Sequence, residues 1–308
     1  MSYDGAPFCG WQVQPSSPSV QGEMERALET LLKAPVGVVG AGRTDTGVSA
    51  SRYVAHFDFD AGVPGALALP DGSIDCKQLT YKLNAILQPS IAVHSIVPVA
   101  PDFHARFDAT CRQYQYFLHR VKDPFLSSRS YYYGYPDVDF EAMNRAALML
   151  LGTHDFSCFE KSGGDNKTSI CTVSRALWEP YVPDLAGGPA GAVAAGSCVA
   201  GDLDAGCCAV EGSAGAVAAG SCAAEGPAGS VAAGAPYWRF TIEADRFLRN
   251  MVRAIVGTLL EVGRGRRTEA GFAALILKPD SSAPRQTLRS NAGESVPGHA
   301  LFLTDIRY

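Results

Sequence analysis

Residues 237–262 read YWRFTIEADRFLRNMVRAIVGTLLEV, a segment in which the spacing of apolar residues changes once. Over 237–244 the large residues Trp238, Phe240 and Ile242 fall at every second position, which is typical of a strand with one buried face. Over 246–262 pairs of large apolar residues return every four positions, which predicts an amphipathic helix. These two periods, one after the other, indicate a fold that mixes strands and helices.

The same kinds of element recur in both directions from this stretch. Elsewhere in the second half of the chain, the patterns predict a helix over 139–151 and further strands over 112–119, 171–182 and 301–308. Towards the N-terminus they predict helices over 20–33 and 77–87 and strands over 36–39, 53–59 and 91–99. With one more strand before the first helix, each half follows the β-α-β-β-α-β order of the ferredoxin-like split βαβ unit. We therefore predict an α+β fold with two such subdomains, residues 1–102 and 103–308.

The first strand of this scheme has little room. The chain begins Ser2-Tyr3-Asp4-Gly5, so either the first half lacks that strand or the given start lies downstream of the true one. We favour the second interpretation, because a missing strand leaves unpaired backbone groups at a sheet edge.

Residues 184–235 differ from the rest in composition. They are rich in Ala and Gly, and GAVAAGSC occurs at both 191–198 and 215–222. With almost no large apolar side chains, such a segment cannot offset the entropy that ordering would cost. We interpret it as a flexible insertion at the tip of a hairpin between strands 171–182 and 237–244, where added length costs little closure entropy.

Composition and charge exclude several classes of protein. Apolar residues make up 47% of the 308 and charged residues 19%, which suits a globular core rather than a disordered chain. The net charge is −5, and residues 182–236 account for it, because they hold five acids and no Lys or Arg. No apolar run is long enough for a membrane span, and the start lacks the features of a secretory signal. Nine cysteines without a C-x-x-C pair, and six scattered histidines, argue against a disulfide framework and a metal site, so we expect a reducing cytoplasmic compartment.

The glycine-rich stretch 40–48, GAGRTDTGV, is the sharpest candidate for chemistry. A dinucleotide-binding loop would need a third glycine at a set distance and a following helix, whereas here a strand follows. What remains is a carboxylate in a tight loop beside an Arg-Thr pair. Asp45 could act as a nucleophile or a base, and Arg43 could pair with a phosphate or orient the acid. An isolated Asp-x-Gly is more often only a turn.

Several separate motifs favour a functional role for Asp45 over a turn, because together they resemble the TruA family of tRNA pseudouridine synthases. The matching stretches are YDG at 3–5, FCGWQVQ at 8–14, VQGE at 20–23, GRTDTGV at 42–48, LNA at 83–85, FHARF at 103–107, RQYQY at 112–116 and FLRNMVRAIVG at 247–257. The resemblance covers most of the chain outside 184–235 and 268–295. It departs from the usual family pattern at Thr46, Ser49, Arg249 and Asn250.

The resemblance implies an isomerase that converts uridine to pseudouridine at positions 38 to 40 of the tRNA anticodon arm, without cofactor or metal. It implies a homodimer and two joined sheets with the active site in a central cleft. By the same resemblance Asp45 is the catalytic carboxylate, Arg253 its ion-pair partner, Tyr114 the ring that stacks on the base, and Arg43 the side chain that replaces the extruded nucleotide. The RNA would also contact Arg106, Arg112 and Arg249.

The implied chemistry makes physical sense for these residue types. The target base must leave its stack, which costs a few kcal/mol, and an aromatic ring returns roughly 1–3 kcal/mol per stacked base. Basic stretches at 104–122 and 246–267 are candidate phosphate tracks, and the alternative is that they are solvated faces. A rival interpretation is a non-catalytic tRNA-binding or tRNA-folding protein on the same scaffold.

Overall fold

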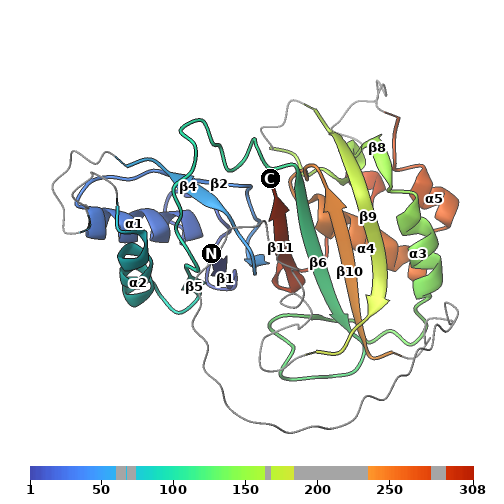
Figure 1. The fold of residues 1–308 in the computed structure, drawn as a ribbon. Coiled ribbons are helices and arrows are strands. Elements are labelled where there is room, and N and C mark those ends of the chain that lie inside the picture. The colour runs from blue at the N-terminus through green and yellow to red at the C-terminus, as the bar shows by residue number, and fades with distance from the viewer. Residues whose placement is uncertain (60–66, 68–73, 164–167, 184–234, 279–288) are drawn as a thin grey trace, which may run out of the picture.

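The computed structural model describes residues 1–59, 67, 74–163, 168–183, 235–278 and 289–308. Helices and strands are mixed, and the largest element is a nine-stranded, mostly antiparallel sheet with the order β5-β1-β3-β11-β6-β10-β9-β8, with β7 paired to β6 (Figure 1). This confirms the α+β prediction in its coarse form. The strands are β1 Ser2–Tyr3, β2 Val38–Gly40, β3 Ser49–Ala50, β4 Ala55–Phe57, β5 Ile91–Ala92, β6 Cys111–His119, β7 Tyr131–Tyr132, β8 Gly152–Asp155, β9 Ile170–Pro180, β10 Tyr237–Ala244 and β11 Leu301–Arg307. The helices are α1 Val20–Leu32, α2 Cys76–Ile86, α3 Phe140–Leu148, α4 Met251–Gly263 and α5 Glu269–Ala273, with short 3-10 turns at Ser157–Phe159, Arg289–Asn291 and Gly298–Ala300.

The C-terminal half of the sheet contains its longest strands. β10 pairs antiparallel with β6 on one side and β9 on the other, and Phe240 lies opposite both Tyr116 and Trp178. The face that the alternating residues predict is buried, and α3 packs onto it through the stacked rings of Phe140 and Trp238, 3.7 Å apart. β9 and β10 are neighbours in the sheet, so residues 184–235 do connect adjacent strands. Residues 184–234 themselves lie outside the described part of the chain.

The N-terminal half is built from shorter pieces. β1 is present, with two residues, and pairs with β3 and β5 in the large sheet. β2 and β4 pair only with each other in a separate two-stranded sheet. The predicted strand 91–99 ends at Ala92, because the Asn84 amide takes over the next backbone groups: it donates to Val93 O at 2.7 Å and accepts from Val93 N at 2.8 Å.

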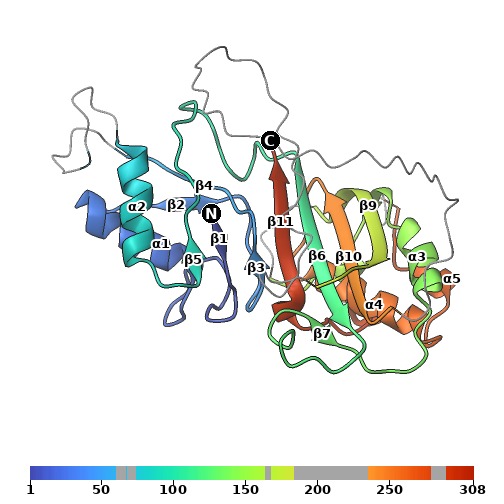
Figure 2. The same ribbon diagram turned by 60° about the horizontal axis from the view of Figure 1, so that its bottom comes forward.

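The two halves are joined by the last strand. β11 lies between β3 and β6 (Figure 2), parallel to β3 through Phe302 and Leu303 and antiparallel to β6. Residues from the chain's end therefore hold a strand of the first half against the sheet of the second half. The joined sheet is antiparallel except at this pair and at the β6–β7 pair.

Two helix boundaries differ clearly from the prediction, and the first is the end of the helix expected over 139–151, which stops at Leu148. The helix expected over 246–262 begins only at Met251, and residues 246–250 form an irregular connection from β10. Asn250 sits in the left-handed region with φ 63°, which a continuous α-helix cannot accommodate. The short strands β3, β7 and β8 were not predicted. Among the described helices, none combines the length and apolar character that crossing a membrane requires.

Helix α4 yields a stability prediction. The backbone of residues 293–296 crosses α4 so closely that a Cβ on Gly257 would lie 1.8 Å from Glu294 O. We expect Gly257→Ala to lower the free energy of unfolding by about 1–3 kcal/mol through overpacking, despite the higher helix propensity of Ala. Urea unfolding followed by circular dichroism measures this. Gly37→Ala is the control, because its Cβ would meet nothing within 4 Å; equal losses in both variants would contradict the prediction.

Candidate active site

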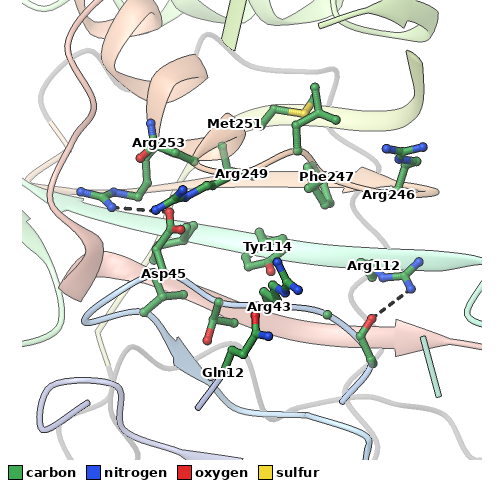
Figure 3. Close-up of a pocket in the computed structure, with 18 of the residues that line it drawn as sticks. Gln12, Arg43, Asp45, Arg112, Tyr114, Arg246, Phe247, Arg249, Met251 and Arg253 are labelled. Atoms are coloured by element: carbon green, nitrogen blue, oxygen red, sulfur yellow. Dashed lines mark hydrogen bonds and ion pairs between the residues drawn. The ribbon is translucent and has the colours of Figure 1, made fainter. Parts of the chain in front are cut away.

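A cavity of about 950 Å³ opens where the two halves meet (Figure 3). It is lined by the loop after β2, the start of β6 and the connection from β10 into α4. The first half contributes Cys9, Gln12, Gln14, Ala41, Gly42, Arg43, Thr44, Asp45, Thr46 and Val48. The second half contributes the rest of the lining, including Arg106, Arg112, Tyr114 and residues 245–253. Its volume is within the range of small-molecule sites.

The loop that carries Asp45 is held by the N-terminal segment. Thr44 accepts a hydrogen bond from Trp11 N at 3.3 Å, and its hydroxyl lies 2.9 Å from the Tyr3 hydroxyl. Gly10 passes so close that a Cβ there would lie 2.4 Å from Thr44 O, and its φ of +98° also favours glycine. The YDG and FCGW motifs therefore have a structural role, because residues from both of them contact Thr44 in the Asp45 loop.

Asp45 meets a guanidinium from the other half of the chain. Its Oδ2 lies 3.5 Å from Nη1 of Arg253, near the start of α4, and both side chains are partly buried (Figure 3). Arg253 is oriented by a second bond, from Nε to Val296 O at 2.7 Å. The structure therefore brings together the two groups that the family resemblance pairs, while their catalytic roles stay a prediction.

Tyr114 lies on β6 and lines the same cavity as Asp45. Only 9% of the residue is exposed, and the ring meets the edge of Phe247 at 5.1 Å with an interplanar angle of 88°. Burial raises the pKa of the Tyr114 hydroxyl well above its usual range, and the negative charge of Asp45 raises it further. Tyr114 is therefore an uncharged phenol at neutral pH, with an aromatic ring at the cavity wall.

Three other predicted arginines line the cavity in different ways. Arg43 comes from the Asp45 loop and Arg106 from the segment before β6. The guanidinium of Arg106 lies 5.6 Å from the ring centroid of Phe107. Arg249, in the irregular connection before α4, donates from Nη1 to the carbonyls of Ser162 and Gly163 at 3.2 and 3.3 Å. Side chains from three separate segments thus add cationic groups to the cavity that Asp45 also lines.

Arg112 also lines the cavity, but its guanidinium is engaged with the protein backbone. Nη1 donates to Ala109 O at 3.0 Å and Asp245 O at 2.6 Å. Nη2 donates to Ala41 O at 3.1 Å and Arg106 O at 2.6 Å. One side chain therefore ties the start of the Asp45 loop to the segment before β6 and to the end of β10. The contact of Arg112 with the substrate stays a prediction, whereas its four hydrogen bonds to backbone carbonyls give it a structural role.

Of the remaining basic residues of the two predicted tracks, Arg246 lines the cavity, whereas its lining does not include Arg120, Lys122, Arg264, Arg266 or Arg267. Arg264 stacks on the Tyr135 ring at 3.5 Å, Arg267 pairs with Glu261 at 2.9 Å, and Arg120 donates to Tyr135 O at 2.7 Å. The sequence reasoning assigned no role to Gln12, Phe107 or Phe247, although all three line the cavity. The only signal in the sequence is that each of the three lies within a motif of the family. Within the described ranges, no three His, Cys, Asp or Glu side chains gather into a potential metal site.

Comparison with known proteins agrees with this geometry. A family model described as tRNA pseudouridine synthase matches residues 146–308, more than half of the chain. Proteins named tRNA pseudouridine synthase A are 41% identical in Parabacteroides distasonis, 40% in Bacteroides thetaiotaomicron and 38% in Bacteroides fragilis. Each alignment covers 100% of this chain, and 94%, 88% and 94% of the respective relative. The chain belongs to the tRNA pseudouridine synthase family. The family resemblance drawn from the motifs is thereby confirmed.

For this member of the tRNA pseudouridine synthase family, the burial of Tyr114 predicts a pH effect on stability. A tyrosine whose folded-state pKa is raised contributes stability that is complete below the unfolded value of about 10 and is lost as the pH rises towards the folded value. The free energy of unfolding should therefore fall as the pH rises above about 10, and Tyr114→Phe should reduce that fall by up to roughly 1.4 kcal/mol per pH unit.

Urea titrations at several pH values would measure the slope. The matched control is Tyr81→Phe, because the Tyr81 side chain in α2 is 75% exposed. We expect that variant to keep the wild-type slope. Equal slopes for Tyr114→Phe and wild type would contradict the burial argument.

Proposed function

We propose that this chain isomerises uridine to pseudouridine in tRNA, with Asp45 as the catalytic carboxylate. The observation that supports this most directly is the Asp45–Arg253 ion pair in a cavity whose wall also includes Tyr114. A carboxylate, a fixed guanidinium and an aromatic ring from three different segments converge on one space. That arrangement is more than a turn-forming Asp-x-Gly requires.

The reaction needs a carboxylate at the sugar. The N1–C1′ bond breaks, the uracil turns, and a C5–C1′ bond forms; the proton on C5 then leaves, and N1 takes up a proton. Asp45 acts either as the nucleophile at C1′ or as the base for an adjacent ribose proton, and both roles place the carboxylate against the sugar. Arg253 holds that carboxylate in place from α4.

The base must be outside its helix for these steps to occur. In our proposal Arg43 occupies the space that the extruded nucleotide leaves, and the Tyr114 ring stacks on the freed uracil. The Tyr114 hydroxyl assists the loss of the C5 proton as a relay, releasing its own proton to solvent as it accepts the one from C5. Stacking returns roughly 1–3 kcal/mol per base, which offsets part of the cost of unstacking. Because Tyr114 stays protonated, no negative charge on its oxygen opposes an anionic RNA.

The finer specification follows the family resemblance. We propose uridines 38 to 40 of the anticodon arm as the targets, a homodimer that contacts one tRNA with both subunits, and a cytoplasmic enzyme that needs no cofactor or metal. Arg106, Arg112 and Arg249, which all line the cavity, would contact the RNA. We also propose that residues 1–102 and 103–308 are two split βαβ subdomains, with the cavity as the cleft between them.

Replacement of the carboxylate tests the activity. The substrate is tRNA with tritium at C5 of uridine, and product formation is followed by tritium release and carbodiimide mapping. We expect Asp45→Asn to abolish release because an amide cannot attack C1′ or remove a ribose proton, while the Kd for tRNA stays within a few-fold. Asp102→Asn is the control, because Asp102 is exposed and does not line the cavity.

Two outcomes would overturn the proposal. Equal turnover by Asp45→Asn and wild type would remove Asp45 from the chemistry. Tight tRNA binding by the wild type with no tritium release would favour the rival function, a tRNA-binding or tRNA-folding protein without catalysis.

A further inference from the structure

Phe107 is a large apolar side chain that faces solvent beside the cavity. The residue is 73% exposed, and it lines the same cavity as Arg43, Asp45 and Tyr114. Single exposed apolar residues are common on protein surfaces, so exposure alone carries no meaning. The position of Phe107 at the cavity and the way its segment is held are the features that call for a function.

The segment around Phe107 is fixed by a histidine. Nδ1 of His104 accepts from the backbone N–H of Arg106 at 3.1 Å and of Phe107 at 3.3 Å. The backbone N–H of His104 donates to Asp108 Oδ2 at 2.7 Å. The His104 ring lies against that of Phe107, with centroids 4.2 Å apart and planes 33° apart. The phenyl ring is therefore supported from its own segment and does not depend on a ligand for its place.

The same segment is also tied to the rest of the cavity wall. Arg112 joins Arg106 O to Ala41 O, at the start of the Asp45 loop. Ala105 N donates to His56 Nδ1 at 3.1 Å, and Tyr308 donates from its hydroxyl to Ala105 O at 2.8 Å. These bonds set the separation between Phe107 and the Asp45 loop, so that a nucleotide bound at one has a defined relation to the other.

We infer that Phe107 is a stacking platform for a nucleobase that neighbours the extruded uridine in the RNA. This inference rests on the proposed function, since it concerns the RNA that the cavity would take. Tyr114 serves the extruded base inside the cavity, whereas the exposed Phe107 ring serves a base that stays outside. Every nucleobase has a π face, so this contact adds affinity with little sequence preference.

The neighbouring arginine favours RNA as the occupant over an apolar ligand. The Arg106 guanidinium lies over the Phe107 ring, 5.6 Å from its centroid, so a cation is in direct reach of the exposed aromatic side chain. Single-stranded nucleic acid offers the groups that complement this pair, a base for the aromatic ring and a phosphate for the cation, at each nucleotide. The platform therefore consists of Phe107 for the base and Arg106 for the phosphate.

Substitutions that separate aromatic stacking from apolar area test the platform. Phe107→Trp keeps the stacking surface, Phe107→Leu keeps apolar area without a ring, and Phe107→Ala removes both. We expect Ala to raise the Kd for tRNA by about 5- to 150-fold, Leu to raise it nearly as much, and Trp to stay within about threefold of wild type. Phe125→Ala is the matched control, because Phe125 is 78% exposed and does not line the cavity.

Two further readouts distinguish stacking from a general loss of structure. 2-Aminopurine placed beside the target uridine should be quenched on binding to wild type and to Phe107→Trp, and less so with Ala or Leu. The salt dependence of log Kd should keep its slope in Phe107→Ala, whereas Arg106→Ala should reduce it by about 1, as expected for one lost phosphate contact.

Several results would overturn the inference. Equal Kd values for Phe107→Ala and Phe125→Ala would show that the ring contacts no RNA. A Leu variant that binds as wild type does would show that only apolar cover matters. Failure of the proposed function has a different signature, because wild type would then release no tritium whatever the effect of Phe107 on binding.

Discussion

The position of β11 between β3 and β6 is the constraint on which the cavity depends. Asp45 and Arg253 are 208 residues apart in the chain, and no local interaction connects them. The Asp45 loop runs directly into β3, and the parallel pairs Phe302–Ser49 and Leu303–Ala50 attach β3 to β11. β11 is bound in turn to β6, which carries Tyr114. A few backbone pairs at the end of the chain therefore set the relation between the carboxylate and the ring.

Within this frame the cavity wall is held by hydrogen bonds to backbone carbonyls. Arg112 binds four of them from three segments, and Tyr53 donates from its hydroxyl to Gly42 O while its ring stacks on Trp11 at 4.2 Å. Catalytic groups act best when their positions are fixed before the substrate arrives, because no reorganisation is then needed during the reaction. The hydrogen bonds from Arg112 to Ala41 O and from Tyr53 to Gly42 O thus fix the start of the Asp45 loop.

How much could be predicted from the sequence depends on the length of the pattern. β10 was predicted to the residue and α1 to within one, because their alternating or fourfold apolar residues recur over eight positions or more. β3 has two residues and β8 four, which is too few for a period to appear, and their pairing depends on strands far along the chain. The start of α4 was predicted wrongly for another reason. Phe247 and Leu248 continue the apolar spacing of the helix, but Phe247 lies in the non-helical connection before it and packs against Tyr114.

The site residues that could be predicted are those that lie within the family motifs. Asp45, Arg253 and Tyr114 lie in stretches that resemble one family, and the structure gathers all three at one cavity. The roles of Arg112 and Phe107 could not be obtained in this way, since a guanidinium in a sequence does not reveal whether carbonyls or phosphates will surround it. Only the folded chain places Ala41, Arg106 and Asp245 around Arg112.

Local charge explains how a chain with a net charge of −5 suits an anionic substrate. The cavity lining holds six arginines and two acids, namely Arg43, Arg106, Arg112, Arg246, Arg249 and Arg253 against Asp45 and Asp245. The Debye length at physiological salt is about 8 Å, so distant acids are screened from a phosphate in the cavity while these arginines are not. Because Arg253 is paired with Asp45, its charge stabilises the carboxylate, and the other arginines provide the positive field at the cavity. The site thus combines a carboxylate that is paired with an arginine and a lining in which arginines outnumber acids, which is the charge distribution that the proposed reaction on tRNA requires.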